Sequence, residues 1–255
     1  MGNENEEKLS DERLREVQTE LTRDCVAGDI RADFKTLADF KRPVLNLMGY
    51  ACRTVLKARA INLDTGIVGS FSEIGAGVAI SQVFILAGHA SQTIVEQKSM
   101  YAQQASDWDY NQGIPLKSHV TEDKLGRMLD RDHASAAQRQ RAEAVGGAVI
   151  FTIADTVATH PSGGRGWLGL RFQTKDERGK VDENEVVSHV RMLNPDTYEQ
   201  QRLLGTFGVN LIFACYQYRD NPARFFASLM DDIPDNEFSI EEIRLRGEAL
   251  SGLER

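Results

Sequence analysis

The residues best placed for chemistry lie beside two glycine-rich turns, and the first of these follows Glu73 in stretch 72–101. There, Gly75 and Gly77 form a Gly-x-Gly turn between an apolar run and an apolar helix. Backbone N–H groups at such a helix start can face an anion. The dinucleotide-binding fingerprint requires a third glycine, but Ile80 stands there, and no βαβ unit is evident. The turn is therefore either a ligand loop or only a tight strand-to-helix connection.

Asp155 and Thr156 form the second candidate site. They fall where the apolar run 148–159 turns polar, near the end of a strand expected to be buried on both faces. Ligands of α/β domains often bind beside such strand ends. Asp155 could act as a general base, accept from a ribose hydroxyl, or cap a loop N–H. Arg165, in the following glycine-rich loop, could close on a phosphate or a carboxylate, or stay solvated.

Other reactive residue types form no complete set. His189 and Arg191 alternate with apolar residues on a predicted strand, so they share a face and need a ligand or a structural ion pair. The histidines form no HxxxH or HxH pair, no GxSxG motif occurs, and we predict no metal and assign no cofactor. The three cysteines, Cys25, Cys52 and Cys215, are scattered, which argues against a zinc site or a disulfide framework.

Charge and hydropathy exclude several classes of protein. The net charge of −8 is concentrated at the ends: residues 1–24 carry eight acidic and four basic side chains, and residues 231–255 carry eight and three. No basic face is visible, so we predict no nucleic-acid partner, although a small basic pocket in the neutral body is still open. No apolar run is long enough for a bilayer, and no signal-peptide pattern appears. We therefore predict a cytoplasmic protein without a membrane partner.

The elements that must position these residues indicate an α/β protein, a mixed sheet with helices packed on it. Residues 1–57 are predicted as an N-terminal helical arm with lead-in helices, and 58–255 as the mixed α/β domain. A stripe of Leu14, Val17 and Leu21 on the arm predicts a homo-oligomer. Within the domain, we expect a hairpin about Asp64-Thr65-Gly66 and a helix through most of stretch 72–101. Further along, we expect a helix from 121 to about 144, an antiparallel meander over 148–192, helices after Pro195 and Pro222, and an edge strand over 238–245.

Two resemblances meet at these motifs. The segments SEIG, GVA, ADTVAT, GWLGLRF, HVRM and LLGTFGVNLIFA resemble a bacterial family of uncharacterised proteins, about twice this length, whose names conflict. That resemblance implies either a short member or a piece of a longer protein. Residues 60–215 are also similar to nicotinamide-nucleotide amidases of the CinA C-terminal type. Glu73 matches that family's glutamate, Gly77 its first paired glycine, Ala90-Ser91 its Ala-Ser and Tyr101 its tyrosine.

The second resemblance implies a CinA C-terminal-like layered domain with a ligand pocket. Its binding residues would be Glu73, Gly75, Gly77, Ser91, Asp155 and Thr156, and we expect Glu73, Gly77, Ser91 and Asp155 to line one cavity. The amidase nucleophile, however, falls on Ile74, and the family lysine falls on Ser106. An isoleucine cannot attack an amide, so the resemblance argues against the amidase reaction.

Three functions are compatible with these residues. The leading hypothesis is a protein that binds a small, nucleotide-like anion in a CinA-like pocket lacking the nucleophile. The second is a structural or self-assembling subunit without catalysis. The third is an enzyme that uses Glu73 or Asp155 as a general base.

Overall fold

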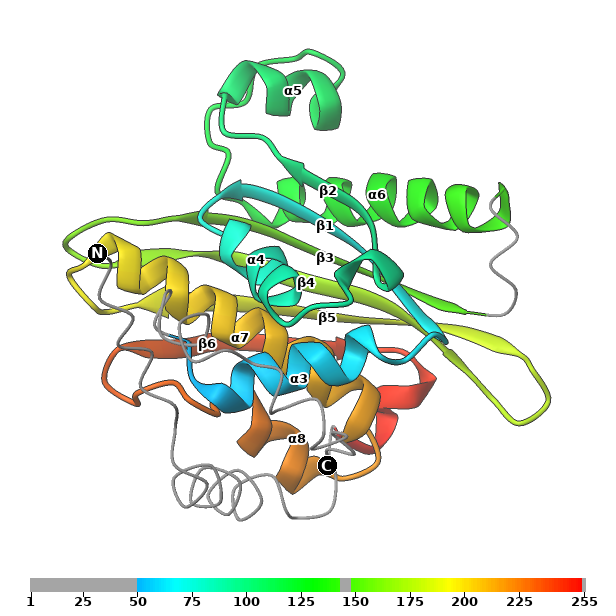
Figure 1. The fold of residues 1–255 in the computed structure, drawn as a ribbon. Coiled ribbons are helices and arrows are strands. Elements are labelled where there is room, and N and C mark those ends of the chain that lie inside the picture. Colours follow the sequence, from blue (N-terminus) through cyan, green and yellow to red (C-terminus); the bar gives the residue numbers. More distant parts are fainter. Residues whose placement is uncertain (1–49, 143–147, 254–255) are drawn as a thin grey trace, which may run out of the picture.

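The computed structural model describes residues 50–142 and 148–253, which form one six-stranded sheet with helices on both faces (Figure 1). The strand order is β2-β1-β3-β4-β5-β6. Strands β1 (Ile67–Gly75), β2 (Ile94–Ser99) and β3 (Val149–Ala158) run parallel, whereas β4 (Gly164–Lys175), β5 (Val181–Met192) and β6 (Phe238–Arg246) continue as antiparallel neighbours. The predicted mixed α/β fold is confirmed, and residues 1–49 of the predicted N-terminal arm and lead-in helices lie outside the described residues.

Helices cover the two faces of the sheet unequally. Helices α3 (Cys52–Asn62), α4 (Val78–Leu86) and α7 (Thr197–Gln217) lie on one face, and α6 (Glu122–Ala142) lies on the other (Figure 1). Helix α5 (Gln103–Asn111) contacts α6, and α8 (Pro222–Leu229) contacts α7. Two short 3-10 helices are η2 (Ala90–Gln92) and η3 (Glu248–Leu253). Because side chains alternate along a strand, Phe71 and Ile153 face α4 and α7, whereas Ala154 faces α6.

Local sequence explains the long helix α7. The Asp196 side chain caps it by accepting a hydrogen bond from the Tyr198 N–H at 2.8 Å. The apolar stripe of α7 is fully buried against the sheet: Leu203, Leu204, Phe207 and Leu211. This stripe, rather than helix propensity alone, holds α7 in place.

Two sequence predictions about this region are wrong. Residues 58–62 form the end of helix α3 instead of a hairpin strand. The helix is held there because Arg59 donates a hydrogen bond to the Ala87 carbonyl and Asn62 donates one to the Phe84 carbonyl, at the end of α4. Residue 57 lies within α3, and the division of the chain into an arm and a domain stays a prediction. Stretch 72–101 contains strand β2, so β1, α4 and β2 form a parallel βαβ unit that sequence patterning did not indicate.

Among the described residues, none of the helices has the length and apolar character needed to cross a membrane.

Candidate carboxyl-pair site

Glu73 and Asp155 lie directly opposite each other on the neighbouring parallel strands β1 and β3. Residues opposite in a ladder project to the same face of a sheet, and here that face carries α4. Both side chains are almost inaccessible to solvent: Glu73 is 6% exposed and Asp155 is 1% exposed. The sheet thus brings two acidic side chains, 82 positions apart in the chain, into one buried pair.

Gly75 and Gly77 allow the chain to pass close over this pair. Gly77 caps α4, and a Cβ atom there would lie 1.5 Å from Asp155 Oδ2. Gly75 has a φ of +105°, and its Cβ would lie 2.1 Å from the Val157 carbonyl oxygen. The two glycines are therefore required by close backbone approach. The turn is a tight strand-to-helix connection that passes directly over the carboxyl pair.

A cavity of about 10 Å³ lies under this turn, between the carboxyl pair and the first turn of α4. Glu73, Gly77, Ile80, Ser81 and Asp155 are among its lining residues. This volume matches about one water molecule, so the cavity is too small for an organic ligand.

Three of the four carboxyl oxygens have no hydrogen bond of good geometry among the described residues: both of Glu73 and Oδ1 of Asp155. The Ser99 hydroxyl is close enough to Glu73 to lower its pKa, but it makes no such bond. Lys98 also borders the cavity, but its ammonium group lies on the other face of the sheet, 2.6 Å from Asp132 and 2.7 Å from Glu96. Leaving a buried polar atom unpaired costs about 1–3 kcal/mol. Other buried side-chain atoms also lack a hydrogen-bond partner, among them the Ser70 and Ser188 hydroxyls, but the Glu73–Asp155 pair places three such oxygens on two adjacent acidic groups.

Burial changes the protonation of the pair. It raises the pKa of Glu73 from 4.5 to about 7, while the neighbouring Ser99 hydroxyl acts in the lowering direction. Burial is also the main cause that raises the pKa of Asp155 well above its usual range, and the adjacent Glu73 charge raises it further. Near neutral pH the pair therefore retains a proton, because two carboxylates this close cannot both ionise easily.

The structure places the other predicted site residues elsewhere. Thr156 is buried on the opposite face of β3, where its hydroxyl donates to the Thr121 carbonyl at 3.3 Å. Ser91 is exposed in η2, three residues before β2, whereas Glu73 pairs with the last residue of β2, Ser99. Ser91 therefore lies toward the opposite end of the strands and does not line the cavity. Gly75 adjoins the cavity at the end of β1.

Sequence reasoning missed a second buried carboxylate, Asp132, on the other face of the sheet. It accepts hydrogen bonds from the Ser72 hydroxyl at 2.5 Å and the Tyr110 hydroxyl at 2.7 Å, and it pairs with Lys98. A signal was present, since Asp132 follows Leu125 at a spacing of seven on the apolar stripe of α6. All of these groups are paired, so the network is a structural tie between α5, α6 and the sheet.

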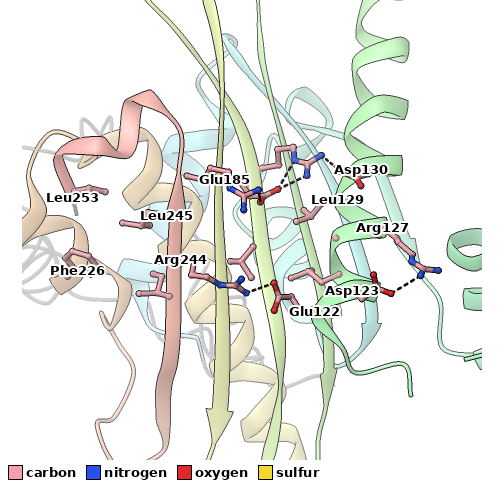
Figure 2. A pocket seen from close by; sticks show the side chains of 16 residues that line it. Glu122, Asp123, Arg127, Leu129, Asp130, Glu185, Phe226, Arg244, Leu245 and Leu253 are labelled. Carbon is pink, nitrogen blue, oxygen red and sulfur yellow. Dashed lines mark hydrogen bonds and ion pairs between the residues drawn. The ribbon is translucent and has the colours of Figure 1, made fainter. Parts of the chain in front are cut away.

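A larger groove of about 1210 Å³ lies between α6 and β6 (Figure 2). Its charged side chains are matched across the groove: Arg171 lies 2.8 Å from Asp130 and 2.6 Å from Glu185, and Arg244 lies 2.5 Å from Glu122. Because these charges already form ion pairs with one another, they do not indicate a binding site for a charged ligand.

No group of three His, Cys, Asp or Glu side chains within residues 50–142 and 148–253 could hold a metal ion. The prediction that the protein holds no metal stays a prediction.

Comparison with known proteins gives a likeness of fold. No protein-family model matches the chain, and no curated protein matches it. Solved structures of competence/damage-inducible proteins are similar. CihA from Agrobacterium tumefaciens has a TM-score of 0.42 and 17% identity over 66% of this chain and 98% of its own. A protein from Enterobacter asburiae has a TM-score of 0.41 and 12% identity over 63% and 94%.

The remote sequence resemblance to the CinA C-terminal type is accompanied by this likeness to solved structures of competence/damage-inducible proteins. At such scores and identities, the likeness says nothing of activity. The resemblance to the longer bacterial family stays a prediction.

Proposed function

We propose that this protein binds a small molecule at the Glu73–Asp155 pair, through N–H or O–H groups of the ligand. The observation that carries the proposal is the set of three buried carboxyl oxygens without hydrogen-bond partners in the described structure. Native proteins rarely bury such atoms unless something satisfies them. A ligand with donors facing the pair would remove this penalty.

The pair itself favours a different ligand chemistry from the anion first predicted. Two adjacent carboxyl groups repel a phosphate or a carboxylate, and they attract amide, amine or hydroxyl donors. An anionic part of the ligand would have to lie away from the pair, toward the backbone N–H groups after Gly75.

Access to the pair requires a local opening, because the cavity holds only about 10 Å³. The first turn of α4 is itself buried, with Ala79 and Ile80 packed against α7, so two features favour the Gly75–Gly77 turn before the helix as the part that moves. The N-cap residue of α4, Gly77, has no side chain that could satisfy the first free N–H groups. The neighbouring β2 is an edge strand, with hydrogen-bonded strand contacts on one side only. Elements with few stabilising contacts open at the lowest free energy.

A matched pair of fragments tests the proposal. Acetamide offers N–H donors, whereas N,N-dimethylacetamide has the same carbonyl and no donor. In protein-observed NMR titrations, acetamide should shift the backbone resonances of Glu73, Gly77 and Asp155 saturably, and the dimethylated fragment should not. The Glu73→Gln, Asp155→Asn double variant should lose the response. Equal responses to both fragments, or an acetamide response that survives in the double variant, would contradict the proposal.

Proton transfer is a second candidate, favoured by the pKa of Glu73 near 7. A general base is most effective when its pKa lies close to the working pH. If turnover of any bound compound is found, its rate should depend on a group with an apparent pKa of about 7. It should fall at least about a hundredfold in Glu73→Gln. A rate that is independent of pH, or unchanged in that variant, would assign Glu73 to binding alone.

Self-association, cytoplasmic location and the absence of a nucleic-acid partner stay predictions. Self-association through the N-terminal stripe concerns residues outside the described ranges. Cytoplasmic location and the absence of a nucleic-acid partner rest on sequence composition alone.

A further inference from the structure

Two arginines lie directly opposite each other in the antiparallel ladder between β4 and β5. Arg165 is the cross-strand partner of Arg191, and both side chains are exposed. The four residues Ala158, Arg165, Arg191 and Ser239 lie opposite one another across β3, β4, β5 and β6 and form one cross-strand row. The two outer members, Ala158 and Ser239, are uncharged. Like charges placed directly opposite in a sheet are destabilising. The row therefore contains a repulsion that none of its own residues offsets.

Carboxylates near the row neutralise it only in part. Arg165 makes no ion pair with any residue in the described ranges. Arg191 reaches Glu241 at 3.9 Å, but the other oxygen of that carboxylate lies 3.0 Å from His189 Nδ1. One acidic side chain is thus shared by two partners, and Arg165 is left with its full charge. This positive spot contrasts with the net charge of −8 of the whole chain.

The row borders a hollow of about 480 Å³ at the β3–β4 turn. Its lining residues include the acidic Glu241, already shared by His189 and Arg191, and otherwise carry no negative charge: Ala158, His160, Ser162, Gly163, Gly164, Arg165 and Arg191. The turn has a defined shape: His160 Nδ1 lies 2.7 Å from the Ser162 hydroxyl and accepts from the Ser162 N–H, while Gly163 adopts a φ of +113° that suits glycine. Small-molecule sites commonly have volumes in this range.

We propose that Arg165 and Arg191 form a binding site for the phosphate or carboxylate group of a small molecule. A guanidinium presents parallel N–H donors that match such a planar or tetrahedral anion, and two of them can hold it from both sides. An anion between the arginines replaces their repulsion with two attractions. Trp167 and His189, stacked with ring centroids 4.5 Å apart, are the next cross-strand pair on the same face.

This anion site is separate from the carboxyl pair. Alternation along β4 and β3 places Arg165 on the face of α6, whereas Asp155 faces α4. The proposal therefore stands whether or not a ligand binds at Glu73, and the experiments distinguish the two.

The test is a titration of the full chain with inorganic phosphate, and in a second arm with acetate, at constant ionic strength, followed by NMR. The wild-type protein should show saturable shifts of the Arg165, Arg191 and Ser162 resonances. Arg165→Ala and Arg191→Ala should each weaken binding by about tenfold, the effect of losing one charged hydrogen-bond partner. Tighter binding of phosphate than of acetate would assign the site to phosphate esters, and the reverse order to carboxylates.

Arg178→Ala is the matched control, because Arg178 is an exposed arginine in the β4–β5 hairpin that also changes the net charge by one. It should bind phosphate as the wild type does, and so should Glu73→Gln. Arg165→Lys and Arg191→Lys keep the charge without the guanidinium, and serve if an alanine variant does not fold. Unsaturable shifts in the wild type, or equal weakening in Arg178→Ala, would overturn the proposal.

Discussion

Replacing Glu73 by glutamine should abolish a large part of the pH dependence of stability. Glutamine has nearly the same shape but stays neutral at every pH. In the wild type, burial raises the folded-state pKa of Glu73 from 4.5 to about 7. The folded protein therefore binds a proton more tightly at this group than the unfolded chain does. That contribution to the free energy of unfolding is complete below about pH 4.5 and is lost as the pH rises through about 7.

The size of the effect follows from the shift. Each pKa unit corresponds to about 1.4 kcal/mol, so the contribution of Glu73 amounts to about 3 kcal/mol between the two protonation limits. Since Glu73 is 6% exposed, solvent screening reduces this value little. Compared with the variant, the wild type should lose about 3 kcal/mol of stability from about pH 4.5 to about pH 8. In the variant, Asp155 should also titrate at a lower pH, because the Glu73 charge that raises the pKa of Asp155 is gone.

Urea unfolding followed by circular dichroism over this pH range measures the difference directly. Glu177→Gln is the control, because Glu177 is exposed in the β4–β5 hairpin. It should track the wild type at every pH. If Glu73→Gln showed the same pH profile as the wild type, Glu73 would not be buried and protonated as described.

Three further predictions concern the turn, the arm and the amidase reaction. Gly77→Ala should destabilise the protein by about 2–4 kcal/mol in thermal unfolding, because its Cβ would lie 1.5 Å from Asp155 Oδ2; an unchanged melting temperature would show that the turn is looser. Light scattering should show an oligomer that deletion of residues 1–24 reduces, and a monomeric full chain would rule out assembly through the arm. Purified protein should release no ammonia from nicotinamide mononucleotide above a heat-killed control, since Ile74 and Ser106 replace the nucleophile and lysine implied by the resemblance; clear turnover would contradict that alignment.

Much of the antiparallel half of the fold could be predicted from sequence. The meander over 148–192 and the edge strand over 238–245 correspond to β3, β4, β5 and β6, because β-branched runs with period two bounded by turn residues are a local signal. In the parallel half, the expected strand after Asp64-Thr65-Gly66 is present as the start of β1, but β2 and the parallel pairing were missed. Strand β2 is short, and its polar and apolar residues alternate too weakly to distinguish it from a continuing helix. Its pairing with β1 is set by tertiary packing and leaves no local sequence signal.

The candidate site was predictable in part, because some of its residues stand at element ends that leave a local sequence signal. Glu73, Gly77 and Asp155 stand at element ends that local patterns reveal, and the sheet does bring them together. Ser91 was included only through the family spacing, and the missed strand β2 places it toward the other end of the sheet. Thr156 follows Asp155 in sequence and was assigned to the same site, yet adjacent residues of a strand face opposite sides.

Carbon-detected NMR titration of the Glu73 and Asp155 carboxyl carbons tests the central claim most directly, because it reports the protonation of each group in the folded protein. The described geometry predicts a midpoint near pH 7 for Glu73 and a higher than usual midpoint for Asp155, with each titration sensing the other. Two independent titrations near about pH 4, the ordinary range for exposed carboxyl groups, would contradict a buried and uncompensated carboxyl pair.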